Sequence, residues 1–281
     1  MPGKSGQRTH DRNGPFNAHG VEVFLPYEAV VDRLEGAAKQ LAGASVLHRG
    51  GLAILRLGAG STSDGNDSRP DVWLQGGIHA NEWIGPAVVL RLMDELVRNS
   101  ELRGRATWYL LPVVDAHGYK RTWAGERFLR TTENRENPNL NFPFRWGEAP
   151  PLLRLLLGRR LRKWMGSHPA SAGCVTSLIA ELRSLNNLEL FMDFYGFGRL
   201  WLYPWCYSSS PSPHDTEHKQ LARLPWQQPT GSREALDTEL RPLHIRRSRW
   251  VGAISTLCMA RSAALIATQS NCRRPTHEGA C

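Results

Sequence analysis

Residues 76–83 combine two side chains whose types and spacing suit metal chemistry. The octet Gly-Gly-Ile-His-Ala-Asn-Glu-Trp places His79 and Glu82 three positions apart. Neutral imidazole and carboxylate are both good ligands for a divalent zinc ion. Because two protein ligands do not hold zinc tightly, the octet predicts part of a metal site, which needs a further ligand from elsewhere in the chain.

The segments around the octet predict how these side chains are positioned. An apolar run at residues 72–74 predicts a buried strand that ends just before the octet. Residues 83–97 predict a helix, with a proline in its first turn and an apolar face. At the exit of a strand, the backbone can aim both side chains at one point.

The rest of the chain alternates in the same way. Apolar periodicity predicts helices at residues 27–41, 151–165 and 178–185, strands at residues 52–57, 106–114, 188–194 and 200–203, and a polar hairpin-like stretch at residues 58–69. Strands that alternate with helices are typical of an α/β sheet covered on both faces.

Composition limits the other classes of function. A chain of 281 residues with 41% hydrophobic content predicts one large core, and no apolar stretch is long enough to span a bilayer. Five scattered cysteines fit a reducing compartment slightly better than a disulfide framework. The first residues show no signal peptide, so the default expectation is a cytoplasmic protein, although the compartment stays open.

The net charge of +9 raises the question of a nucleic-acid partner. From residue 222 onward, nine arginines stand against four acidic residues. Because much of the excess lies in this tail, we expect no nucleic-acid partner. The sequence does not predict an oligomeric state.

Five segments match one family's motifs in that family's order. Residues 77–84 resemble Gly-Ile-His-Ala-Arg-Glu-Trp-Ile, residues 112–119 resemble Pro-Val-x-Asn-Pro-Asp-Gly-Tyr, residues 127–131 resemble Arg-x-Trp-Arg-Lys, residues 139–142 resemble Asn-Arg-Asn-Phe/Trp, and residues 191–196 with 202–204 resemble Phe-Ile-Asp-Leu-His-Ser and Met-Tyr-Pro. The chain therefore resembles the carboxypeptidase A/B-type zinc metallocarboxypeptidases over about residues 25–206. The resemblance implies a mixed, twisted sheet flanked by helices, incomplete here because the usual C-terminal third has no recognisable counterpart.

The resemblance also implies a chemistry. One zinc ion, held by two histidines, a glutamate and water, would activate that water and remove the C-terminal residue of a peptide or protein. His79 and Glu82 match the first two ligands, and Arg130 matches the catalytic arginine that stabilises the oxyanion. Asn139 and Asn81 stand at substrate-binding positions, the latter where the family has arginine.

Three departures weaken this chemistry. Tyr195 stands where the family has its third ligand, a histidine, and a phenol is a poor zinc ligand at neutral pH. Leu140 replaces the arginine that grips the terminal carboxylate. Glu239-Leu240-Arg241 has the letters of the family's general-base motif but follows Tyr195 too closely, so we interpret it as chance. Losing the base alone costs about 10²–10⁴ in rate.

Three hypotheses follow. The first is a zinc carboxypeptidase-like hydrolase, and the second is a non-catalytic pseudo-peptidase that binds peptide or protein at the inherited site. The third is an incomplete product whose C-terminal portion is out of frame, which the Arg/Ser/Cys-rich residues 248–281 favour. We expect a disordered segment at residues 1–19, a carboxypeptidase-like domain at residues 20–207, and an unmatched Ser/Pro- then Arg-rich segment at residues 208–281.

Three further residues or segments allow two interpretations. His214 to His218 fits the inverted zinc motif His-x-x-Glu-His, but its polar surroundings favour a surface segment over a second metal site. The Leu- and Arg-rich residues 152–165 suit a membrane-surface helix or, as we prefer, an ordinary surface helix. His117 stands where the family has aspartate, and we expect a loop histidine there.

Overall fold

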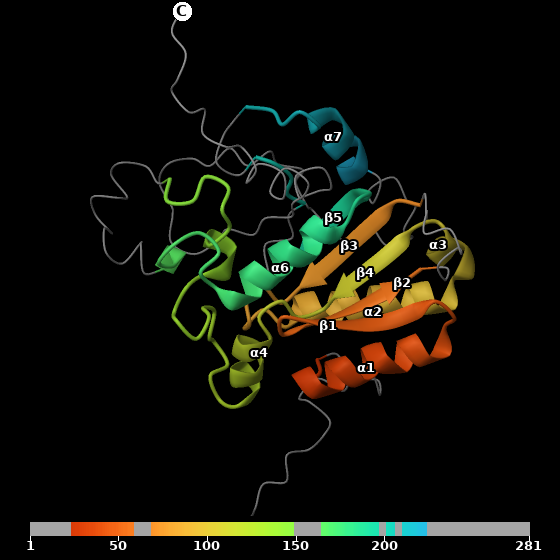
Figure 1. Cartoon of the computed structure of the whole chain (residues 1–281), viewed down its shortest axis with the longest axis horizontal. Helices are drawn as coiled ribbons and strands as arrows, with labels where there is room; N and C mark the ends of the chain where they lie inside the picture. Colours follow the sequence, from red (N-terminus) through yellow and green to blue (C-terminus); the bar gives the residue numbers. More distant parts are fainter. Residues whose placement is uncertain (1–23, 59–68, 149–163, 197–200, 206–209, 224–281) are drawn as a thin grey trace, which may run out of the picture.

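The computed structural model describes residues 24–58, 69–148, 164–196, 201–205 and 210–223 (Figure 1). The elements in chain order are α1 (Tyr27–Gln40), β1 (Ala44–Arg49), β2 (Leu52–Leu57), β3 (Asp71–Gly76), α2 (Ile84–Arg98), α3 (Ser100–Gly104), β4 (Thr107–Leu111), α4 (Ala116–Trp123), the 3-10 turn η1 (Pro138–Leu140), α6 (Gly173–Ser184), β5 (Leu188–Phe194) and α7 (Asp215–Arg223).

A mixed five-stranded sheet with the order β1-β2-β4-β3-β5 forms the centre of the described fold. The strands β1, β2 and β4 pair antiparallel, whereas β3 pairs parallel with both β4 and β5. The carboxyl ends of β3, β4 and β5 therefore lie at one edge of the sheet. Side chains that follow these three strands meet there, which is where open α/β sheets bind ligands.

Alternation along the strands assigns side chains to two cores. On β2, Leu55 and Leu57 pack with α1 and α2, while Leu52 and Ile54 pack with α6 on the opposite face. On β3, Trp73 joins the α6 side while its neighbours face α1 and α2. Successive strand residues point to opposite faces, so an apolar run fills both cores at once. Helices cover both faces of the sheet in Figure 1, which gives three layers.

Most predicted elements are present, with shifted ends. The strand predicted at residues 106–114 is shorter, because β4 ends at Leu111. The helix predicted from residue 178 begins earlier, at Gly173. His117 lies in the first turn of α4, not in a loop, and its side chain is exposed.

One predicted strand is wrong and one observed strand was not predicted. Leu202 and Tyr203 are buried but belong to no strand. An apolar run predicts burial, and burial does not require backbone hydrogen bonds to a neighbouring strand. The edge strand β1 was missed because its residues are half-exposed and lack clean alternation. Most of the predicted hairpin-like stretch at 58–69, and of the Leu- and Arg-rich helix at 151–165, lies outside the described residues.

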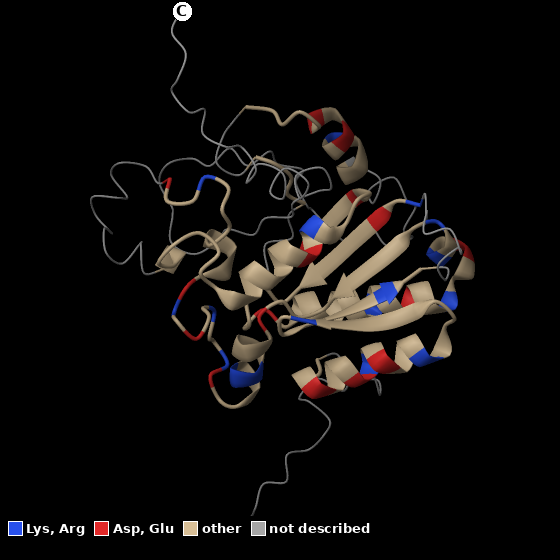
Figure 2. Ribbon diagram, in the orientation of Figure 1, with Lys and Arg blue, Asp and Glu red and all other residues tan. Residues whose placement is uncertain are grey.

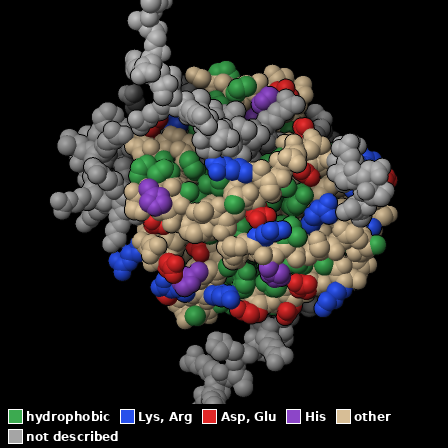
Figure 3. Space-filling model, viewed as in Figure 1, with side chains coloured by type: hydrophobic (Ala, Val, Ile, Leu, Met, Phe, Trp, Pro, Cys, Tyr) green, Lys and Arg blue, Asp and Glu red, His purple; other side chains and the backbone are tan. Residues whose placement is uncertain are grey.

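Charged residues lie mainly on the helices and loops, while the middle of the sheet is uncharged (Figure 2). On the face seen in Figure 3, acidic and basic side chains are interspersed with hydrophobic ones. Among the described helices, none combines the length and the apolar content that crossing a membrane requires.

Candidate functional site

The turn after β3 brings His79 and Glu82 together. Gly77 adopts a positive φ of 63°, and a Cβ there would lie 3.0 Å from the carbonyl oxygen of Pro112. The backbone N–H of Glu82 donates to the carbonyl of His79 at 3.1 Å, which closes the turn. As a result, His79 Nδ1 lies 3.3 Å from Glu82 Oε1. The octet therefore aims both side chains at one point, as its position after a strand predicted.

A second glycine, Gly85, allows the start of α2 to pack closely against the end of β5. A Cβ on Gly85 would lie 2.4 Å from the carbonyl oxygen of Phe194, closer than real Cβ atoms come. Only a glycine permits this approach, which places the start of α2 beside the exit of β5. Tyr195 and Gly196, which follow β5, thereby reach the side chains of the octet.

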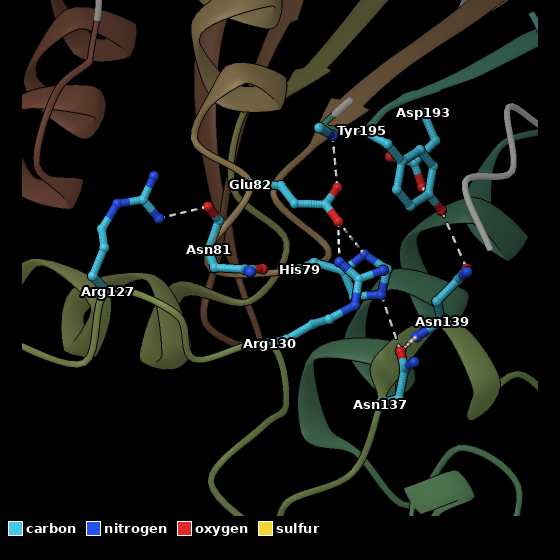
Figure 4. A network of polar contacts seen from close by, with 10 residues as sticks. His79, Asn81, Glu82, Arg127, Arg130, Asn137, Asn139, Asp193 and Tyr195 are labelled. Carbon is cyan, nitrogen blue, oxygen red and sulfur yellow. Dashed lines mark hydrogen bonds and ion pairs between the residues drawn. The ribbon is translucent and has the colours of Figure 1, made fainter. Parts of the chain in front are cut away.

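Asn137 forms a hydrogen bond with Nε2 of His79 (Figure 4). The ring is fully buried, and its Nε2 lies 3.0 Å from Asn137 Oδ1. The same oxygen accepts from the backbone N–H of Asn139, which fixes the orientation of the amide. Because that oxygen only accepts, Nε2 carries a proton and donates it. Nδ1 is buried without a well-aligned hydrogen bond, although Glu82 Oε1 is close.

Glu82 is surrounded by donors. Its side chain is 10% exposed, Gly196 N–H donates to Oε2 at 2.7 Å, and Arg130 Nη1 contacts Oε1. Burial raises the pKa of the Glu82 carboxyl, but the contacts with His79, Gly196 and Arg130 outweigh burial and leave the pKa below its ordinary value. Glu82 is therefore a carboxylate whose two oxygens are both engaged.

Tyr195 belongs to a buried polar chain that runs into the core. Its hydroxyl donates to Asp193 Oδ2 at 2.9 Å and also lies 3.2 Å from Asn139 Oδ1. Gln75 Nε2 donates to the same oxygen of Asp193 at 2.8 Å, and Trp73 Nε1 donates to Gln75 Oε1. Burial raises the pKa of the Asp193 carboxyl to about 8, although the two donors lower it.

The predicted substrate-binding residues lie around this core of the site. Asn139, in η1, contacts Tyr195, while Asn81 follows His79 in the octet turn. The carbonyl oxygen of Asn81 accepts from Arg127 Nη1 at 2.7 Å, and the Arg127 guanidinium lies 3.8 Å from the ring centroid of Trp83. Figure 4 shows Asn81 and Arg127 on one side of His79 and the Asn139–Tyr195 pair on the other.

These residues match only part of a catalytic zinc site. His79 Nδ1 and Glu82 Oε1 converge as two ligands would. The ring centroid of Tyr195 lies 5.6 Å from that of His79, but its hydroxyl is engaged by Asp193 and Asn139. Among the described residues no three His, Cys, Asp or Glu side chains group as metal ligands. The described donor set therefore does not fit the three-ligand zinc of the resemblance.

Comparison with known proteins identifies the family of the chain. A sequence model of the zinc carboxypeptidases matches residues 37–241, well over half of the chain. The chain belongs to the zinc carboxypeptidase family. The match continues past Tyr207, where the recognisable motifs stop.

Individual relatives are distant and longer. The chain is 26% identical over 176 residues to carboxypeptidase B of Astacus astacus, covering 56% of this chain and 54% of that protein. It is 27% identical over 222 residues to zinc carboxypeptidase A 1 of Anopheles gambiae, covering 74% and 50%. The chain thus spans about half the length of these family members.

Solved structures share the fold. Carboxypeptidase A from Helicoverpa armigera superposes with a TM-score of 0.61 at 23% identity, covering 71% of this chain and 53% of that one. Bovine thrombin-activatable fibrinolysis inhibitor, in complex with tick carboxypeptidase inhibitor, gives 0.58 at 20% identity, covering 71% and 70%. The predicted mixed sheet flanked by helices is confirmed.

Three residues of the site were not singled out from the sequence. Asn137 had no signal beyond its place beside a proline. The available signal for Gln75 is a polar residue at the end of an apolar strand, and Asp193 lies two positions before Tyr195 inside a quoted motif. All three are buried, and each contacts the site through a hydrogen bond.

The inverted zinc motif forms no metal cluster in the described part of the chain. His214 immediately precedes α7 and His218 lies on it, with ring centroids 6.4 Å apart. His218 is buried against Tyr203 and contacts Ser212 at 3.2 Å. We interpret it as a packing residue.

Proposed function

We propose that this chain binds the C-terminal segment of a peptide or protein at the carboxyl edge of β3 and β5, without hydrolysing it efficiently. The observation that carries the proposal is Tyr195. A phenol occupies the third-ligand position, and its hydroxyl is committed to Asp193 and Asn139. Zinc-activated water needs three protein ligands to hold the metal, so hydrolysis is the part of the family's activity most affected.

The family supports the choice of ligand. Carboxypeptidases act on peptides that carry a C-terminus, and a solved structural neighbour is bound to a carboxypeptidase inhibitor from tick. The fold that positions such a ligand is present here, with His79, Arg130 and Asn139 grouped at one edge of the sheet (Figure 4).

Recognition of the terminal carboxylate is weakened. Leu140, in η1, stands where the resemblance places the gripping arginine, and a hydrogen bond to a charged group contributes about 1.5–3 kcal/mol. Asn139 alone offers a neutral amide, which contributes about 1 kcal/mol. We therefore expect a free C-terminus to be preferred over an amidated one by less than about tenfold.

Fluorescence anisotropy with one labelled peptide, made as a free acid and as an amide, tests the proposal. We expect saturable binding of both forms, weakened by Asn139→Ala. Asn187→Ala is the matched control, because Asn187 lies before β5 at the opposite end of the strand. Hydrolysis of a blocked dipeptide is measured in parallel with added zinc. Turnover at rates typical of enzymes, about 1 s⁻¹ or more, would overturn the proposal.

Metal-assisted hydrolysis is the second candidate, and one observation favours it. His79 Nδ1 is buried without a well-aligned hydrogen bond, 3.3 Å from Glu82 Oε1. This candidate predicts one equivalent of zinc in the purified protein, lost in Glu82→Gln, together with release of a C-terminal residue.

A further inference from the structure

The side-chain amide of Asn139 is not fixed by the turn that carries it. The backbone N–H of Asn139 donates to Asn137 Oδ1 at 3.1 Å, which holds the main chain of η1. Asn139 is partly exposed, and the last torsion of an asparagine side chain has a broad distribution. The amide therefore keeps one orientation toward a ligand only when a group outside η1 bonds to it.

Tyr195 supplies such a group (Figure 4). Its hydroxyl lies 3.2 Å from Asn139 Oδ1, although the two residues are 56 positions apart in the chain. Its ring packs against the core on the α6 side of the sheet and lies 5.6 Å, centroid to centroid, from the buried ring of His79. A tyrosine side chain has only two χ angles, so packing of the ring also fixes the position of the hydroxyl oxygen.

A buried polar chain anchors the same hydroxyl from the other side. The Tyr195 hydroxyl donates to Asp193 Oδ2 at 2.9 Å, and Gln75 Nε2 donates to that oxygen at 2.8 Å. Gln75 Oε1 in turn accepts from Trp73 Nε1 at 2.8 Å. Because Asp193 and Gln75 are buried, water does not compete for these bonds. The chain joins β3 to β5 and reaches Asn139 through Tyr195.

We propose that Tyr195 is a positioning residue, which holds the side-chain amide of Asn139 in one orientation toward the ligand and is itself held by Asp193. The inference rests on the proposed function, in which Asn139 contacts the bound C-terminal segment. It gives the residue at the third-ligand position a part in ligand binding. Two consequences follow: the Asn139 amide responds to changes at Tyr195 before any ligand binds, and loss of the hydroxyl weakens binding through Asn139.

The first experiment needs no ligand. In protein made with isotope-labelled asparagine, the NMR signals of the Asn139 side-chain amide are those missing from Asn139→Ala. The order parameter of this amide should fall from about 0.85 in the parent protein to below about 0.6 in Tyr195→Phe, which keeps the ring and removes the hydroxyl. An amide that stays equally ordered in Tyr195→Phe would overturn the proposal.

Variants of Asp193 test the anchor, and a second tyrosine gives the control. Asp193→Ala should also loosen the Asn139 amide, whereas Asp193→Asn keeps an acceptor oxygen and should leave the amide ordered. Tyr27→Phe removes the hydroxyl of a partly buried tyrosine that packs on the α1 side of the sheet, so it should change neither the order of the amide nor binding.

The second experiment measures binding of the labelled peptide by fluorescence anisotropy. Asn139→Ala should weaken binding about fivefold, the effect of one neutral hydrogen bond. Tyr195→Phe should weaken binding about three- to fivefold. The double variant should lose no more than Asn139→Ala alone, because the hydroxyl has nothing to position once the amide is gone. Losses that multiply in the double variant would contradict the inference.

The two experiments separate this inference from the proposed function. A parent protein that binds no peptide refutes the proposed function, and the order of the Asn139 amide then decides alone whether Tyr195 positions it. Binding that is weakened by Asn139→Ala but unchanged in Tyr195→Phe leaves the proposed function standing and overturns the inference. Binding that Asn139→Ala does not weaken also overturns it, because Asn139 would then make no contact with the ligand.

Discussion

Asp193→Asn should make the stability of this protein less dependent on pH. Asp193 is 3% exposed. Burial raises the pKa of its carboxyl to about 8 in the folded protein, against about 3.9 in the unfolded chain. Between these values the folded state holds a proton that the unfolded state has released. The free energy of unfolding therefore falls as pH rises through this window, by at most about 1.4 kcal/mol per unit.

Asparagine copies the protonated acid. Oδ2 of Asp193 accepts from Gln75 Nε2 and the Tyr195 hydroxyl, so the amide oxygen can take both bonds. Because Oδ2 accepts both bonds, we expect the proton of the neutral acid on Oδ1, which is buried without a hydrogen-bond partner, and the amide nitrogen can take the place of that O–H. The variant keeps the contacts and loses the ionisation.

The assay is urea unfolding of both proteins, followed by tryptophan fluorescence. From about pH 5 to about pH 7, the free energy of unfolding of Asp193→Asn should gain about 2–3 kcal/mol relative to the parent protein. Titrations that the two proteins share cancel in this difference. Glu189→Gln, an exposed position on β5, controls for removing a negative charge from the same strand. A difference that is constant with pH, or that shrinks as pH rises, would refute the reasoning.

Three other perturbations follow from the same contacts. Gly85→Ala should lower the free energy of unfolding by about 1–3 kcal/mol because its Cβ would meet the carbonyl of Phe194 at 2.4 Å, whereas Gly36→Ala, with open space around it, should be neutral or stabilising in the same urea assay. Tyr195→His should raise zinc affinity at least about tenfold by adding a nitrogen ligand, and an unchanged dye titration would contradict the placement of this residue. Asn141→Ala should cost about 2–4 kcal/mol, measured by thermal unfolding, because its side chain accepts from Ala172 N–H and donates to Met165 and Ser171. A loss below about 1 kcal/mol would show that water replaces those bonds.

Periodicity predicted the elements that make the core. The helix α2 and the strands β2, β3 and β5 carry regular apolar spacing because each packs against a buried layer. The edge strand β1 has no such layer on its exposed side. Its nearest sequence signal is the Gly50-Gly51 pair, whose positive φ values turn the chain into β2.

Half of the site is local in sequence and half is not. His79 and Glu82 are three residues apart, so their spacing alone predicted that they converge. Arg130 comes from a loop without periodicity, 48 positions after Glu82. Resemblance placed Arg130 near the site, but its pairing with Glu82 depends on the path of that loop. Sequence patterns carry no information about such a path.

The tyrosine at the third-ligand position and the contact between Arg130 and Glu82 both affect how the site accommodates its buried carboxyl groups. Without its third ligand, a zinc ion loses much of its affinity, and Glu82 would remain a buried carboxylate with nothing to neutralise it. The guanidinium of Arg130 contacts Glu82 and offsets that cost. The Tyr195 hydroxyl donates a hydrogen bond to the buried Asp193. An imidazole bound to a metal at this position would not donate in the same way. Because the resemblance places an arginine at the position of Arg130 together with zinc, recovery of a tight metal site depends on residue 195.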